Sequence, residues 1–443
     1  MKYNLLLKSA VIVVITLLLL IPTFMIQNLI TERQQTQQNA VMEVSSKWGN
    51  AQTLSGPFLT IPFIHYQKEI SENDKKEKLI PIKQSLHILP ENLSIKGDVS
   101  PQKRSRGIYE VVLYNSEVKI SGDFQNIDWE KLGIDTKNLL MDQAYITVGV
   151  SDLRGIENRV QLKWNNRDLL FNPGTVTGDL AESGISIGVP VSVSDKKPYT
   201  FSFQLNLKGS QWLRFVPIGK VTDVELKSPW ANPGFDGAFL PDSRTVTPDG
   251  FTAHWNILNL NRNFPQQWVG DRYSLKRTSF GVDLLLPVDN YQKAMRSIKY
   301  AILFIALTFL VFFFVEIMNK KFIHPIQYAL VGIALVLFFS LLLSFSEYMS
   351  FNLSYIVSAL LTLALVAGYA RAILRSGPLT FLVTGILTAL YGFIFVIIQL
   401  QDYALLFGSV GLFVILAIVM YFSRKIDWYS ISGELSKADK QGE

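Results

Sequence analysis

Six apolar runs, each long enough to cross a lipid bilayer as a helix, constrain the fold of this chain more than any other feature. Crossing roughly 30 Å of hydrocarbon takes about 20 apolar residues in a helix. The first run is Ala10–Ile26, and no charged residue lies between Lys8 and Glu32. The others lie at residues 300–318, 328–345, 351–370, 379–400 and 403–422. These runs predict a helical membrane protein with one N-terminal and five C-terminal transmembrane helices.

The first run has two interpretations, an uncleaved anchor or a cleaved signal peptide. Lys2 and Lys8 precede it, as basic residues precede the apolar stretch of a signal peptide. The residues that follow, Ile21–Gln27, offer no pair of small residues at the spacing of a cleavage site. We therefore interpret residues 1–30 as an anchor that stays in the protein.

Most of the charged residues lie between the first run and the other five. Of the 78 charged residues in the chain, 61 fall within residues 31–299, whereas residues 300–423 are nearly free of charge. Such a charge density is typical of a soluble domain. We predict a large soluble domain at residues 31–299, a membrane bundle at 300–423 and a cytoplasmic tail at 424–443. The net charge of +6 is mild and no basic stripe interleaves with aromatic residues, so we expect no nucleic-acid partner.

The loops between the membrane runs predict the orientation, because Lys and Arg accumulate on the cytoplasmic side of a membrane. One set of loops and ends is basic and comprises Lys2, Lys8, Lys320, Lys321, Arg371, Arg375, Arg424 and Lys425. The opposite loops, 346–350 and 401–402, carry Glu347 and Asp402 and no basic residue. We therefore expect both termini in the cytoplasm and residues 31–299 outside it.

The soluble domain is predicted to be mostly β after a helical stalk. Residues 31–50 are rich in helix formers and are followed by the turn sequence Ser55-Gly56-Pro57. Beyond them apolar and polar residues alternate, most clearly over Tyr199–Lys208, which is typical of an antiparallel strand with one buried face. We predict a sandwich or a pair of packed sheets, with one helix near Asp128–Asp135.

The sequence carries little that predicts catalysis or a cofactor. It has no cysteine, which excludes disulfides and thiolate catalysis, and no two of its four histidines have ligand spacing. Gly184-Ile185-Ser186-Ile187-Gly188 matches a hydrolase nucleophile motif, but that motif needs a strand-to-helix turn. Here it lies within an alternating run, so we interpret Ser186 as a strand residue. We predict no catalytic residue, no metal and no cofactor.

Four polar residues of the membrane region form a candidate site, because charges inside a bilayer are costly and commonly functional. Glu316 lies near the cytoplasmic end of its run, where pairing with Lys320 one turn later is the alternative. Near the outer face, a shared polar opening or ordinary loop residues are the two interpretations of Glu347, Gln399 and Asp402. We also expect the bundle interior to pack through small residues at Ser340/Ser344, Ala364/Gly368 and Gly385/Ala389.

Five aromatic residues of the soluble domain form a candidate partner-binding surface: Phe235, Phe239, Trp255, Phe264 and Trp268. Aromatic side chains dominate protein cores as well as interfaces, so a place in the core is the alternative.

Short motifs spread over nearly the whole chain resemble the CreD family of bacterial inner-membrane proteins. They include Gly56-Pro57, Ser228-Pro229-Trp230, Phe235-Asp236-Gly237-Ala238-Phe239-Leu240-Pro241, Asn261-Arg262-Asn263-Phe264-Pro265-Gln266, His324-Pro325-Ile326-Gln327-Tyr328, Gln401-Asp402-Tyr403 and Asp427-Trp428-Tyr429. The resemblance implies a multi-pass inner-membrane protein with residues 31–299 in the periplasm. It also implies a link to cell-envelope integrity, envelope stress and the response to β-lactams. It implies no catalytic residue.

Three functions are compatible with these features. The first is a non-enzymatic envelope-maintenance protein whose β domain binds a periplasmic envelope protein or a lipid, with membrane lipids around its bundle. The second is a transporter or lipid-handling channel that uses Glu316, Glu347 and Asp402. The third is a periplasmic hydrolase, for which loss of activity on Ser186→Ala is the test.

Overall fold

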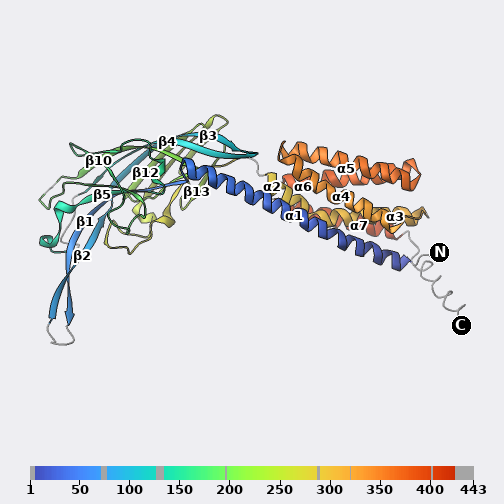
Figure 1. The fold of residues 1–443 in the computed structure, drawn as a ribbon, viewed down its shortest axis with the longest axis horizontal. Helices are drawn as coiled ribbons and strands as arrows, with labels where there is room; N and C mark the ends of the chain where they lie inside the picture. Colours follow the sequence, from blue (N-terminus) through green and yellow to red (C-terminus); the bar gives the residue numbers. More distant parts are fainter. Residues whose placement is uncertain are drawn as a thin grey trace. The chain divides into compact units, whose positions relative to one another are not determined.

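The structure, a computed structural model, describes residues 5–70, 77–125, 134–194, 197–286, 290–319, 321–400 and 403–424 (Figure 1). By its contacts the chain divides into two compact units, Met1–Gln37 with Val288–Glu443, and Gln38–Pro287. The first unit is helical and the second is β, so the predicted fold class is confirmed for a membrane-helical region with a large β domain. Most of the helix expected near Asp128–Asp135 falls outside the described residues.

The helical unit is built from long apolar helices. Its elements are α1 (Leu5–Trp48), α2 (Asn290–Lys299), α3 (Ala301–Met318), α4 (Pro325–Ser346), α5 (Phe351–Leu374), α6 (Gly377–Gln399) and α7 (Ala404–Ser423). Within the described part of the chain, α1 and α3 to α6 are long and apolar enough to cross a membrane. The apolar stretch of α7 is shorter over its described side chains, Leu405–Tyr421, so a sixth span stays a prediction.

Capping hydrogen bonds and a proline explain why α4 begins earlier than predicted. Apolar residues alone predict that this helix begins at Tyr328, but it begins at Pro325. His324 Nδ1 accepts from the backbone N–H of Ile326, and Gln327 Oε1 accepts from the N–H of His324 at 2.9 Å. Proline suits the first helical position because its missing N–H would be unpaired there. The capping residues therefore extend α4 by one turn.

A glycine in α4 lets α1 pack closely against the helices that follow the β domain. A Cβ added at Gly332 would lie 2.2 Å from Leu19 of α1 and 2.8 Å from Phe309 of α3. Small residues allow this close approach in membranes. The small-residue pairs expected to pack the interior were wrong for Ala364/Gly368 and Gly385/Ala389, and Ser344 of the third pair is exposed. Gly368 and Gly385 have nothing within 4 Å of an added Cβ, and the small partners Ala364 and Ala389 are exposed.

The β unit consists of two sheets. Its strands are β1 (Gln52–Ile70), β2 (Glu77–Ile88), β3 (Asn92–Arg106), β4 (Tyr109–Phe124), β5 (Tyr145–Val150), β6 (Gln161–Trp164), β7 (Arg167–Leu170), β8 (Asn172–Pro173), β9 (Gly184–Gly188), β10 (Tyr199–Ser210), β11 (Trp212–Phe215), β12 (Val221–Ser228), β13 (Pro233–Gly237), β14 (Ser243–Thr247), β15 (Gly250–Leu258), β16 (Gln267–Val269) and β17 (Phe280–Leu284). One sheet runs β13-β17-β11-β1-β5-β9-β8, with β2 on β1 and β16 on β2. The other runs β14-β15-β12-β3-β4-β10-β6-β7. Residues of both sheets share one hydrophobic core.

The pairing is mostly antiparallel, as the alternating pattern predicts. In β10, Phe201, Phe203 and Leu205 are buried, and Ser202 and Gln204 between them are less so. Two pairs are parallel, β1 with β11 and β3 with β12. Alternation reports that one face is buried but carries no information on the direction of the neighbouring strand.

The last turns of α1 belong to the β unit. The indole of Trp48 lies under Lys208 Nζ, 4.6 Å from the ring centre, and Arg154 Nη1 donates to the carbonyl of Ser46 at 2.6 Å. Asp152 accepts from the backbone N–H of Asn50 at 3.0 Å, just past the end of the helix. One continuous helix therefore supplies packing residues to both units.

Candidate functional site

A buried ion pair joins the first helix to the helical unit. Lys8 of α1 donates to the Glu316 carboxylate of α3, and both side chains are almost fully buried. Lys8 Nζ also donates to the carbonyl of Ile323 at 2.6 Å. Tyr328 of α4 donates to the second Glu316 oxygen at 2.9 Å. Lys320, the alternative partner of Glu316, lies outside the described residues, and the described partner Lys8 is 308 residues away.

The contacts of this pair satisfy both charges. Glu316 also accepts from the N–H of Ile323 at 3.3 Å, and Lys8 Nζ lies 4.4 Å from the ring centre of Phe322. Taking an ion out of water costs several kcal/mol, which attraction offsets only when the remaining hydrogen bonds are made. Removing one partner of such a pair costs about 3–5 kcal/mol, because the other charge is left buried alone. The geometry is that of an anchor between α1, α3 and α4.

Glu347 is held near the other end of α1. It follows the last residue of α4, and Arg33 Nε of α1 lies 3.6 Å from its Oε1. Tyr291 of α2 donates to the same oxygen at 3.2 Å. Lys8 and Arg33 are 25 residues apart in α1, which corresponds to about 37 Å of helix. This length exceeds the roughly 30 Å of a hydrocarbon layer, so the two pairs bracket the predicted span.

Gln399 is held by α2 and α5. Lys293 Nζ of α2 lies 3.4 Å from Gln399 Oε1, and the Gln399 amide donates to Asn352 Oδ1 at the start of α5. The last predicted member of the polar set, Asp402, lies outside the described residues. Glu347 and Gln399 thus each bind protein groups, and both contact α2. Sequence reasoning missed α2 because it was counted as part of the soluble domain.

The predicted aromatic surface is largely core, which corrects that interpretation. Trp255 is fully buried, and Phe264 and Trp268 are nearly so. Phe235 and Phe239 are half-buried and pack edge-on against aromatic rings of the same core. The physical reason is the large apolar area of these rings, because the free energy gained on burial increases with the apolar area removed from water. The alternative interpretation, an aromatic core, describes these residues.

The hydrolase-like motif occupies strand β9, as expected. Ser186 lies opposite Thr147 of β5, and its hydroxyl donates to the carbonyl of Gly174 at 2.9 Å. Ser186 therefore occupies a paired position in a strand and not the strand-to-helix turn that exposes a nucleophilic serine. Among the described residues, no three His, Cys, Asp or Glu side chains gather where they could hold a metal ion.

Sequence reasoning missed a row of polar and aromatic side chains in the first sheet. The registers place Trp268, His87, Thr60 and Tyr145 side by side on β16, β2, β1 and β5. His87 Nδ1 lies 3.0 Å from Thr60 Oγ1, and His87 Nε2 lies 3.0 Å from Asp179 Oδ2. Burial lowers the pKa of His87, and the Asp179 carboxylate opposes that shift only in part. Sequence spacing could not predict this row, because strand pairing brings together residues that are far apart in the chain.

A second missed feature is the β1–β2 hairpin. The two strands pair from Leu59/Ile88 out to Ile70/Glu77. Among the described residues, no third strand pairs with the hairpin beyond Phe63 and Ser85. In Figure 1 the two strands extend beyond the body of the β unit. Apolar side chains are exposed along this part, and they are Tyr66, Leu79 and Ile82.

Comparison with known proteins supports a chain in which apolar helices precede and follow a β domain. The family model described as "Inner membrane protein CreD" matches residues 4–429. The inner membrane protein CreD of Escherichia coli K12 is 33% identical over 432 residues, which cover 96% of this chain and 94% of that protein. The match therefore includes both the helical unit and the β unit. This chain belongs to the CreD family of multi-pass inner-membrane proteins.

Proposed function

We propose that this protein is a non-enzymatic component of the inner membrane that maintains cell-envelope integrity under envelope stress and β-lactam challenge. In this proposal its β domain lies in the periplasm and binds a protein of the envelope. The observation that carries the proposal is the exposed β1–β2 hairpin, whose apolar side chains and strand edges lack a neighbouring strand among the described residues.

The hairpin has the properties of a docking element for a polypeptide. Tyr66 and Leu79 are each about half exposed on one face, and Ile82 is exposed on the other. A two-stranded hairpin alone in water is marginally stable, and free strand edges are templates for pairing with another chain. A partner strand added at this edge would gain main-chain hydrogen bonds and cover the apolar side chains.

The charge of the helix ends supports the proposed orientation. Lys321, Arg371, Arg375 and Arg424 are exposed and lie at the ends of α3, α5 and α7, while the loop after α4 at the opposite end carries Glu347 and no basic residue. Basic residues also lie in α2, but they belong to the segment that leads out of the β domain, and long translocated domains are largely exempt from the charge bias. Basic residues on one side favour that side as cytoplasmic. Lys8 adds little to this argument, since Glu316 neutralises it.

Transport is the second candidate function, and the buried charge of Glu316 is the observation that favours it. Against it, the contacts of Glu316 and Glu347 with Lys8, Tyr328, Arg33 and Tyr291 occupy the carboxylates that a substrate would use. We therefore assign these carboxylates to anchoring.

The hairpin assignment is tested by complementation. A strain that lacks this gene is challenged with detergent and a β-lactam, and receives either the native protein or the Tyr66→Ser/Leu79→Ser/Ile82→Ser variant at equal membrane abundance. We expect the variant to lose most of the protection, because serine removes the apolar surface but leaves the backbone unchanged.

The matched control removes the same number of exposed apolar side chains elsewhere in the β domain. Val176→Ser/Leu240→Ser/Leu260→Ser meets this requirement, since all three residues are at least 60% exposed. The control is expected to protect as well as the native protein. Full protection by the hairpin variant would remove the basis of the proposal.

A further inference from the structure

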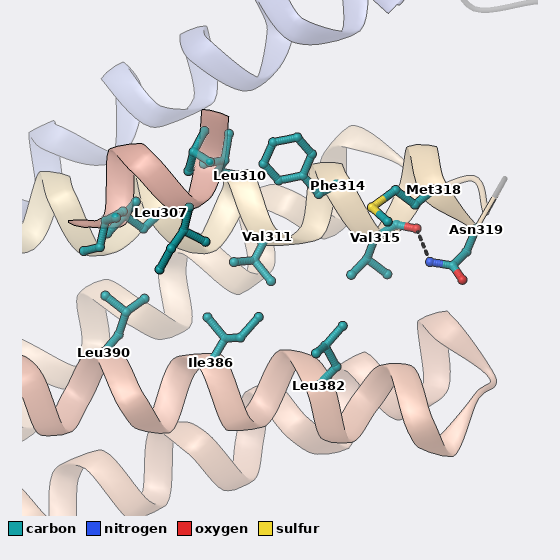
Figure 2. Close-up of a pocket in the computed structure, with 13 residues that line it drawn as sticks. Leu307, Leu310, Val311, Phe314, Val315, Met318, Asn319, Leu382, Ile386 and Leu390 are labelled. Atoms are coloured by element: carbon teal, nitrogen blue, oxygen red, sulfur yellow. Dashed lines mark hydrogen bonds between the residues drawn. The ribbon is translucent and has the colours of Figure 1, made fainter. Parts of the chain in front are cut away.

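A long apolar groove runs along α3 between α6 and α7 (Figure 2). It has a volume of about 360 Å³. Its lining residues are Leu307, Leu310, Val311, Phe314, Val315 and Met318 of α3, Asn319 directly after α3, Leu382, Ile386 and Leu390 of α6, and Ile415, Ile418 and Val419 of α7. The groove opens to the surface, because Leu382, Met318 and Ile418 are each about half exposed.

The described lining of the groove is almost entirely apolar. Asn319 carries its only polar side chain, and that amide donates to the carbonyl of Val315 at 2.9 Å (Figure 2). The other lining side chains are aliphatic, aromatic or thioether. A ligand that fills this groove gains from burial of apolar surface alone.

The length of the groove suits an acyl chain of one leaflet. From Leu307 to Asn319 the groove follows 12 residues of α3, or about 18 Å, close to the roughly 15 Å of one leaflet. A single extended hydrocarbon chain can follow a groove of this length.

Basic residues adjoin the helix ends at the Met318 end of the groove. Lys321 follows Asn319 by two residues, Arg375 precedes α6, and Arg424 follows Val419 by five residues. All three side chains are exposed. The only acidic residue described at these helix ends is Glu316, and Lys8 already neutralises it. A phosphate at this end would therefore lie on the side of the helices where the described charge is mainly positive.

We propose that this groove is a binding site for an anionic glycerophospholipid, with one acyl chain along α3 and the phosphate near Lys321, Arg375 and Arg424. The lipid belongs to the leaflet on the Met318 side. The site is independent of the proposed function of the hairpin, so failure of either proposal leaves the other standing.

Native mass spectrometry of the full-length protein in detergent tests the proposal, with phosphatidylglycerol and phosphatidylethanolamine as the added lipids. Leu382→Trp fills the groove, and Leu361→Trp is the matched control. Leu361 lies on α5, is 49% exposed like Leu382 at 50%, and does not line the groove. A Lys321→Gln/Arg375→Gln/Arg424→Gln variant tests the headgroup.

The native protein and Leu361→Trp are expected to retain one phosphatidylglycerol, and Leu382→Trp to bind it roughly tenfold more weakly. The triple Gln variant is expected to lose the preference for phosphatidylglycerol over phosphatidylethanolamine. Equal retention by the two Trp variants, or equal binding of the two lipids by the native protein, would overturn the proposal. A shift from dimer to monomer on Leu382→Trp would also overturn it, by assigning the groove to a second copy of the chain.

Discussion

Lys8 and Glu316, separated by 308 residues, form a buried ion pair that joins the N-terminal helix to the helices that follow the β domain. Tyr328 completes the pair by donating to the free carboxylate oxygen. The pair makes α1 part of the helical unit instead of a separate anchor. It also provides Glu316 with a structural role that competes with any role in transport.

The first prediction concerns the stability of this pair. Glu316→Leu alone is expected to lower the free energy of unfolding by about 3–5 kcal/mol, because Lys8 is left buried without its partner. Lys8→Met/Glu316→Leu is expected to recover most of that loss, since an apolar pair carries no desolvation cost. Denaturant titration of both variants in the same detergent measures the difference. Equal destabilisation would show that the two charges do not act as a pair.

The contact between α1 and α4 is open to cross-linking, because the chain has no cysteine of its own. Leu19→Cys/Gly332→Cys is expected to form a disulfide on mild oxidation, since an added Cβ at Gly332 lies against the Leu19 side chain. Leu19→Cys/Gly385→Cys is the control, because Gly385 has nothing within 4 Å of an added Cβ. Comparable yields from the two pairs would contradict the packing of α1 on α4.

The burial of His87 predicts that the stability of the β domain depends on pH. Burial lowers its pKa below 6.5 in the folded protein, so the unfolded chain takes up the proton first as the pH falls. The free energy of unfolding is therefore expected to be constant above about pH 7 and to decrease as the pH falls through 6.5. Urea titrations monitored by tryptophan fluorescence at several pH values measure this slope. His87→Gln is expected to reduce it, and a slope unchanged by His87→Gln would refute the assignment, with His65→Gln as the exposed control.

The contacts of Arg262 predict that the stability of the β domain requires a guanidinium group at this position. It is buried, and it donates to the carbonyls of Phe264 at 2.6 Å and Ile218 at 3.0 Å and to the Gln266 side chain. Burial lowers its pKa to about 10, so the group stays charged at neutral pH. Arg262→Lys is expected to cost about 1.5–3 kcal/mol, because an ammonium cannot reach these acceptors together. Arg244→Lys, at an exposed arginine, is the control in the same unfolding assay, and equal effects of the two would contradict this role.

The sequence predicted the features that depend on local composition. Apolar runs located the helices, and alternation over Tyr199–Lys208 predicted a strand with one buried face. The partner of Glu316 could not be predicted in this way, since the i,i+4 rule points to Lys320 while the folded chain brings Lys8 to it. Small residues in the sequence likewise do not tell which helix face meets a neighbour, and Gly332 rather than Gly385 lies at a contact.

The candidate site was predicted only as residue types. Glu316, Glu347 and Gln399 were identified because polar groups are rare in membrane runs, but their partners come from α1, α2, α4 and α5. The buried row through His87 depends on the register of four strands. A one-residue slip in register would move these side chains to the opposite face of the sheet. The row therefore depends on the strand register, which sequence spacing does not predict.

The most direct test of the anchoring role is complementation with three proteins at equal membrane abundance: native, Glu316→Leu, and Lys8→Met/Glu316→Leu. If Glu316 serves to hold α1, the single variant fails to protect a strain that lacks the gene against detergent and β-lactam, and the double variant protects nearly as well as the native protein. If the double variant is folded, present in the membrane and as inactive as the single one, the carboxylate itself is required. Glu316 would then be a transport residue, and the anchoring account would be wrong.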